Sequence, residues 1–154
     1  MKAYFGRRYR FSASHRLHAE SLSEQQNRET YGKCNNPYGH GHNYVVEVMV
    51  GGEVDPVTGM VCDLVRLDAC VKQQVIEPFD HSNLNYQDCF AQQVSTTENL
   101  CIEIDRRLRQ SFHEAEIASV RVEETRNNFF EINHQTSTPA GSRGMRGSKS
   151  ECLL

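Results

Sequence analysis

The chain has 154 residues, of which 38% are hydrophobic, which suits one domain with a packed core rather than two domains. Its formal net charge is −3 without a long run of one sign, which argues against nucleic acid or an acidic membrane as a partner. The sequence shows no signal peptide and no apolar run near the roughly 20 residues that span a bilayer. We therefore expect a cytoplasmic protein with reduced cysteines and a small-molecule partner.

Alternating side chains predict two strands in the first third of the chain. One face of the first strand runs from Phe5 to His15, and one face of the second runs from His40 to Val50. The polar segment from Glu20 to Asn36 between them predicts a loop. Turn residues between positions 51 and 59 predict a hairpin that pairs the second strand with a strand at Met60–Leu64.

Apolar spacings of three and four predict a helix over residues 66–76, which stops before Pro78, and a loop follows up to residue 94. Ser95 and Glu98 have the spacing of a capping box, which predicts a second helix. Strands at 118–124 and 129–132 follow. The fold class is therefore α+β: an antiparallel sheet with two helices on one face. We expect the domain to span residues 1–132 and residues 133–154 to form a disordered tail.

The segment from Cys34 to His42 carries a thiol followed by a His-x-His pair. In a strand, His40 and His42 point to the same side, and His15 ends the neighbouring strand face. Three histidines with one open position form a catalytic zinc site, whereas a fourth ligand such as Cys34 would close it into a structural one. The spacing alone leaves both arrangements open.

Two further groups of residues can carry chemistry. Asp80 precedes His81, and a carboxylate beside a histidine can fix its tautomer and raise its basicity. Glu124 continues an apolar strand face, where a carboxylate needs a polar partner unless the strand ends and leaves it in solvent.

Seven segments together resemble the 6-pyruvoyl-tetrahydropterin synthase family over roughly residues 4–132. They are Phe11-Ser-Ala-Ser-His-Arg-Leu17, Gly32-Lys-Cys-Asn-Asn-Pro37, Gly39-His-Gly-His-Asn-Tyr44, Asp55-Pro-Val-Thr-Gly-Met60, Asp80-His-Ser-Asn-Leu84, Ser95-Thr-Thr-Glu-Asn99 and Val122-Glu-Glu-Thr125. Tyr38 departs from the asparagine that the family usually has there.

The resemblance implies a tunnelling fold, in which ββααββ subunits form trimeric barrels that stack as a homohexamer with active sites between subunits. It implies one Zn²⁺ per subunit on His15, His40 and His42, with Cys34 as the catalytic base and Asp80 with His81 as a proton relay. Pterin contacts fall on Glu124, as the anchor, and on Thr96, Thr97 and Glu98. The implied substrate is 7,8-dihydroneopterin triphosphate, with Mg²⁺ as a counterion for its triphosphate.

Two other functions stay open at this point. The related 6-carboxy-tetrahydropterin synthase of deazaguanine biosynthesis shares the zinc histidines, but its cysteine usually lies closer to the His-Gly-His motif than the five residues found here. A non-catalytic zinc- or pterin-binding module would need neither Cys34 nor Asp80 and His81. Basic residues at Arg16 and Lys33 are the better candidates for binding the triphosphate, because they lie within the segments named above.

Overall fold

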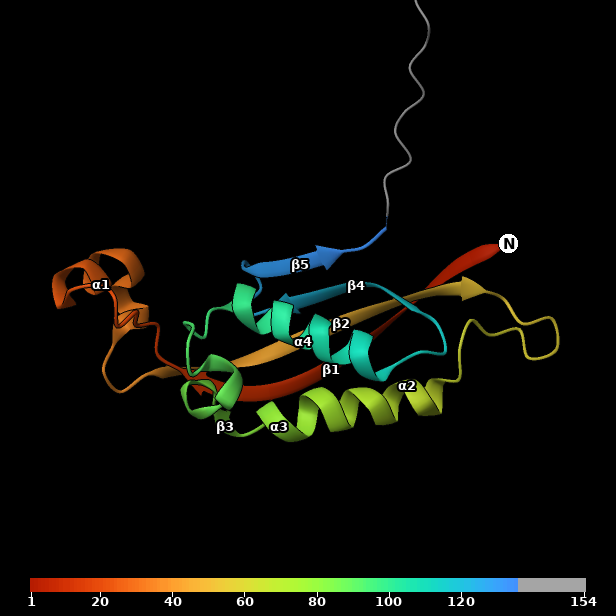
Figure 1. The fold of residues 1–154 in the computed structure, drawn as a ribbon, viewed down its shortest axis with the longest axis horizontal. Coiled ribbons are helices and arrows are strands. Elements are labelled where there is room, and N and C mark those ends of the chain that lie inside the picture. Colours follow the sequence, from red (N-terminus) through yellow and green to blue (C-terminus); the bar gives the residue numbers. More distant parts are fainter. Residues whose placement is uncertain (136–154) are drawn as a thin grey trace, which may run out of the picture.

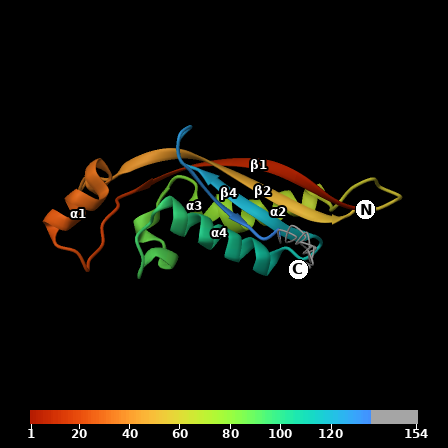
Figure 2. The same ribbon diagram turned by 90° about the horizontal axis from the view of Figure 1, so that it is seen from above.

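The computed structural model describes residues 1–135, which form one curved sheet with helices packed against one of its faces (Figures 1 and 2). The strands are β1 (Lys2–His15), β2 (His40–Glu53), β3 (Ser82–Asn83), β4 (Glu116–Glu123) and β5 (Phe129–Asn133). The helices are α1 (Glu24–Tyr31), α2 (Leu64–Val71), α3 (Glu77–Phe79) and α4 (Thr97–Ser111). Short 3-10 turns occupy Gly32–Asn35, Leu84–Tyr86 and Asp88–Phe90.

The sheet has the order β3-β1-β2-β4-β5, and its four longer strands pair antiparallel. The long β1–β2 ribbon pairs His15 with His40 and Ala13 with His42. The predicted α+β fold and antiparallel sheet are thus confirmed. The sequence did not reveal β3, which is two residues long and pairs parallel with β1 inside the expected loop 79–94.

The core lies between the sheet and helices α2 and α4. Apolar residues at spacings of three and four on both helices meet the alternating inward side chains of β1, β2 and β4. The fully buried members of this core include Tyr44, Val46, Val48, Leu67, Val71, Leu100, Ile104, Leu108, Val120 and Val122. This packing holds the ends of β1 and β2 beside the first turn of α4.

Residues 16–39, which we call the lobe, project beyond the end of the sheet between β1 and β2 (Figure 1). The expected loop 20–36 is wrong, because the lobe contains α1. Ser23 caps this helix, and Gln26 completes a capping box with it. The helix was missed because its only buried side chain is Asn27, so it has no apolar stripe.

The expected strand at Met60–Leu64 is also wrong. Asp55 organises a turn there instead, since its carboxylate accepts from the amides of Val57 and Thr58 at 2.9 and 2.7 Å. Asp63 then caps α2, which begins at Leu64, two residues before the predicted start.

The first long helix does not stop before Pro78. A π-helical segment, Lys72–Ile76, joins α2 to α3 and places Pro78 in the first turn of α3. The proline is tolerated because the carbonyl of Gln74, four residues earlier, accepts a hydrogen bond from Nη1 of Arg107 at 3.2 Å in place of the missing amide. The helix therefore continues to Phe79.

The cap of α4 is Thr96 rather than Ser95, because the Thr96 hydroxyl accepts from the amide of Asn99 at 3.2 Å. At the other end of the domain, β5 runs to Asn133, and the amide of His134 donates to the carbonyl of Ala118. Most of the predicted tail, residues 136–154, lies outside the described residues. Among residues 1–135, the structure contains no helix of the length and apolarity that crossing a membrane requires.

Candidate metal centre and active site

His15, His40 and His42 gather at the end of the β1–β2 ribbon next to the lobe. The β1–β2 register and the two-residue side-chain period bring the three rings onto one face of the sheet. One ligand atom from each lies within 4.8 Å of the others, and the ring centroids are 4.7 to 5.2 Å apart. The predicted convergence of these histidines is therefore confirmed.

A backbone carbonyl from the turn before α4 orients His15. Nδ1 of His15 donates a hydrogen bond to the carbonyl oxygen of Ser95 at 2.7 Å. The His15 side chain is completely buried. A neutral imidazole that donates from Nδ1 presents its Nε2 lone pair to the other histidines, which is how metal-binding histidines are commonly oriented. No sequence motif pointed to this contact, because a carbonyl carries no side-chain signature.

The donor atoms fit a zinc ion. Two nitrogen ligands at about 2.0–2.1 Å from a tetrahedral Zn²⁺ lie about 3.3 Å from each other. The Nε2 atoms of His15 and His40 are 3.1 Å apart. Within residues 1–135, buried Nε2 of His42 has no hydrogen-bond partner, and buried polar atoms rarely stay unpaired. A metal ion would satisfy all three nitrogens.

Burial also favours the metal-binding form of these rings. Removal from water lowers the pKa of His15 and of His42, and the neighbouring His40 lowers them further, although the hydrogen bond to Ser95 and the charge of Glu124 act the other way. Both rings are therefore neutral at pH 7, as metal coordination requires.

Glu124 lies directly beside the histidines, just after the end of β4. Its Oε1 is 3.6 Å from Nε2 of His15 and 3.5 Å from Nε2 of His42, and it accepts a hydrogen bond from the Thr97 hydroxyl at 2.9 Å. Only 17% of its side chain is exposed, which rejects the reading of Glu124 as a solvated strand end. A carboxylate at the metal centre can accept protons or bind a cationic or donor-rich ligand.

Cys34 lies in the lobe, in the turn Gly32–Asn35, and is half-buried. The only group able to hold a metal among residues 1–135 consists of the three histidines, so the thiol is outside the ligand set. The cysteine nevertheless lies near the same end of the sheet, because its carbonyl accepts a hydrogen bond from the amide of Leu17, two residues after His15, at 2.9 Å. The open three-histidine arrangement is thus favoured over a closed one.

Tyr38 does not shape the turn that carries Cys34. Asn36 holds this turn by accepting from the amides of Tyr38 and Gly39. The Tyr38 side chain is 96% exposed. Gly39 has a φ of 69°, and a Cβ there would lie 2.9 Å from the carbonyl oxygen of His15, so only glycine fits where the lobe rejoins β2.

Asp80 and His81 form the predicted pair. Oδ2 of Asp80 is 2.9 Å from Nδ1 of His81, and the backbone of Ser12 binds both residues. The hydrogen bond from Ser12 and the contact with His81 lower the pKa of Asp80, so the carboxylate is charged and can orient the ring. His81 has a φ of 54°, a conformation rare in residues other than glycine and often found at functional sites.

This pair does not join the three histidines of its own chain. His81 lines a cavity of about 420 Å³ with Ser12, Ser14 and Asn43, and His42 of the histidine group also contributes to its wall. The side chains of Ser12 and Ser14 alternate with those of Ala13 and His15, so the two serines face the side of the sheet opposite to the His15 ring. In the described part of the chain, no hydrogen bond or ion pair links His81 to the histidine cluster.

Of the pterin contacts predicted at the start of α4, namely Thr96, Thr97 and Glu98, only one lies against Glu124. Thr97 binds Glu124, as described above, whereas Thr96 serves as the cap of α4. Glu98 is exposed in the first turn. Of the three, Thr97 alone has a hydrogen bond to Glu124 within residues 1–135.

Comparisons with known proteins agree on one family. Residues 4–135 match the family model described as 6-pyruvoyl tetrahydropterin synthase. The chain is similar to a 6-pyruvoyl tetrahydrobiopterin synthase of Poecilia reticulata, with 48% identity over 81% of this chain and 86% of the relative, and to one of Homo sapiens, with 46% identity over 82% and 88%. A solved structure of Caenorhabditis elegans 6-pyruvoyl tetrahydropterin synthase has a TM-score of 0.83 and 42% identity, covering 86% of this chain and 96% of that one.

Proposed function

The chain belongs to the 6-pyruvoyl tetrahydropterin synthase family, and from this we propose that it is a zinc-dependent lyase of tetrahydrobiopterin biosynthesis. The reaction converts 7,8-dihydroneopterin triphosphate to 6-pyruvoyl-tetrahydropterin and releases triphosphate. The observation that carries this proposal is the three-histidine group, in which His15 is buried, with the Glu124 carboxylate beside it and no fourth ligand among residues 1–135.

The residues around this group suit the chemistry. His15, His40 and His42 would hold the zinc ion, which would supply Lewis-acid activation of the substrate's side-chain hydroxyls and so acidify the adjacent C–H bonds. Cys34, as a thiolate, removes a proton from carbon, which is general base catalysis. The Glu124 carboxylate accepts hydrogen bonds from N–H groups of the pterin. The Thr97 hydroxyl holds that carboxylate in place by donating a hydrogen bond to it.

Asp80 and His81 act on the site of a neighbouring subunit in this proposal. Within residues 1–135 no hydrogen bond or ion pair links them to their own metal centre, yet Asp80 fixes the tautomer of His81 and leaves Nε2 exposed for proton transfer. A site shared between subunits requires an oligomer, and we propose the family's homohexamer, a dimer of trimers, joined through β5 and through the part of β1 that β3 leaves uncovered. Mg²⁺ as a counterion of the triphosphate stays a prediction.

Product identification tests the function directly. The purified full-length protein, loaded with zinc, is incubated with 7,8-dihydroneopterin triphosphate, and the pterin product is identified by mass. We expect a pyruvoyl pterin and free triphosphate. A carboxy pterin would identify the deazaguanine enzyme instead, and no turnover would leave a binding module.

Replacing Glu124 with glutamine should weaken substrate binding at least tenfold and leave the zinc content unchanged. The amide keeps the size of the side chain but loses the charge and one acceptor, and a hydrogen bond to a charged group contributes about 1.5–3 kcal/mol. KM and bound zinc, measured on the same preparation, check this. An equal loss of substrate affinity and of zinc would mean that Glu124 supports the fold or the metal rather than the pterin.

A further inference from the structure

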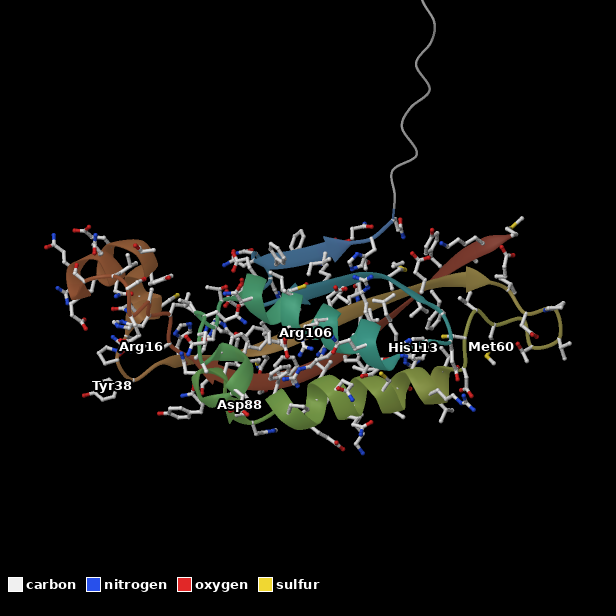
Figure 3. The ribbon with its side chains drawn as sticks, viewed as in Figure 1. Arg16, Tyr38, Met60, Asp88, Arg106 and His113 are labelled. Atoms are coloured by element: carbon white, nitrogen blue, oxygen red, sulfur yellow. The ribbon has the colours of Figure 1, made fainter. Side chains whose placement is uncertain are left out.

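The lobe carries a basic cavity of about 410 Å³, lined by residues on both sides of Cys34. Three cationic side chains, Arg16, Arg28 and Lys33, and a single carboxylate, Glu24, contribute to its wall. A cavity with this excess of positive charge attracts anions. Arg16 lies where the lobe joins the sheet, directly after His15 at the end of β1 (Figure 3).

Two of the three cations have no acidic partner. Arg28 lies 3.8 Å from Glu24, and both side chains are exposed. In contrast, within residues 1–135 no carboxylate lies within 4.0 Å of the charged nitrogens of Arg16 or Lys33. These two cations are therefore available to an external anion.

The position of Arg16 is fixed. Its backbone amide donates to the Asn85 side chain at 2.7 Å, and its Nε donates to the carbonyl of Asn35 at 3.0 Å. These contacts leave the Nη hydrogens of the guanidinium without a partner in the described part of the chain. Such a planar group, held in place with donors to spare, suits bidentate binding of phosphate oxygens.

Arg16 and Lys33 are each adjacent in sequence to a residue with a proposed role in the reaction. Arg16 follows the metal ligand His15, and Lys33 precedes Cys34. The amide of Leu17 donates to the carbonyl of Cys34 at 2.9 Å, which ties the two segments together. Glu124 and Thr97, in contrast, approach the histidines from β4 and α4.

We propose that Arg16 and Lys33 bind the triphosphate of the substrate in this cavity and stabilise it as it leaves. The inference rests on the proposed function. In dihydroneopterin triphosphate the reacting carbons lie between the pterin and the triphosphate. A substrate with its pterin at Glu124 and its reacting carbons at the metal and Cys34 therefore directs its triphosphate toward the lobe. Two cations there neutralise the negative charge that develops on the leaving group.

The larger cavity of about 690 Å³ on the other side of Arg16 is a weaker candidate. Arg16 and Glu20 are its only side chains with a permanent charge, so their charges cancel, and Tyr38 and Tyr86 line much of the remainder. A polyanion has no electrostatic reason to prefer it.

Calorimetric titration with inorganic triphosphate tests this site without turnover. The full-length zinc-loaded protein and its Arg16→Gln, Lys33→Gln and Arg109→Gln variants are compared. Arg109 is an exposed cation in the last turn of α4, the end of that helix away from the metal centre, and serves as the matched control. We expect about tenfold or weaker binding in the first two variants, wild-type binding in the control, and a partial return of affinity in Arg16→Lys.

Equal triphosphate binding by wild type, Arg16→Gln and Lys33→Gln would overturn the inference, and so would an equal loss in Arg109→Gln. Zinc content and thermal midpoint of each variant show that it is folded, and Lys33, which is exposed, provides a variant without packing loss. The proposed function can fail separately from this inference. If the wild-type protein binds triphosphate through Arg16 and Lys33 but forms no pyruvoyl pterin, the anion site is supported and the proposed reaction is wrong.

Discussion

Replacing Cys34 with alanine should leave the bound zinc unchanged and slow turnover by a factor of about 10²–10⁴, the range that general acid–base catalysis contributes. The thiol lies in the lobe and outside the group that could hold the metal, so its loss removes no ligand. The thiolate is the group proposed to take a carbon-bound proton, and alanine has no replacement for it. Steady-state kcat and zinc content of the purified variant give the two numbers needed.

Cys70 provides the matched control for this experiment. It is a half-buried thiol on α2, without a proposed role, so Cys70→Ala should retain wild-type kcat. Cys34→Ser keeps the size of the side chain with a much weaker base and should be nearly as slow as alanine. Full activity in Cys34→Ala would show that Cys34 is not the base. Loss of zinc in that variant would show that Cys34 is a zinc ligand.

Removal of the metal should abolish product formation and destabilise the fold, and stoichiometric Zn²⁺ should reverse both effects. An ion that binds only the folded state stabilises it by about 4 kcal/mol when its concentration is 1,000 times its Kd. Chelation followed by thermal unfolding and an activity assay measures both changes. His42→Ala should reproduce them with one ligand missing, and an unchanged thermal midpoint and zinc content in that variant would contradict the assigned site.

The same ligands predict a pH dependence for the metal-free protein. Burial lowers the pKa of His15 and of His42 below that of an unfolded chain, about 6.5. The unfolded state therefore binds more protons as the pH falls below about 6.5, so the free energy of unfolding decreases there and levels off below the folded-state pKa values. Zinc binding weakens in the same direction because protons compete for the nitrogens. Denaturant titrations at pH 7.5, 6.5 and 5.5 test the sign.

The convergence of the three histidines could be predicted from the sequence because alternation in a strand is a strong, local signal. His15, His40 and His42 continue apolar faces of period two, and the pairing of β1 with β2 then brings them together. The contact between Thr97 and Glu124 depends on the packing of α4 against β4, which no periodicity reveals. The same holds for the Ser95 carbonyl that orients His15.

The wrong predictions at residues 20–36 and at Met60–Leu64 share one cause: side chains hydrogen-bonded to the backbone, rather than a hydrophobic pattern, determine the structure there. Asn27 organises α1 through hydrogen bonds to Ala19, Leu22 and Ser23, so the helix needs no apolar stripe. At the expected hairpin, the Asp55 carboxylate instead accepts hydrogen bonds from the amides of Val57 and Thr58 and so forms a tight turn. The pair Ser23 and Gln26 was the one readable signal for α1, because it has capping-box spacing.

The lobe begins immediately after His15 and ends immediately before His40. A metal ion bound by these two residues is therefore also a cross-link that closes a loop of about 25 residues, and such links restrict the chain most where the enclosed segment is long. The segment so enclosed carries Cys34, Lys33 and Arg16. Zinc would thus have a mechanical role besides its chemical one: it would restrain both ends of the segment that carries the base, and its removal would leave those ends held by the pairing of β1 with β2.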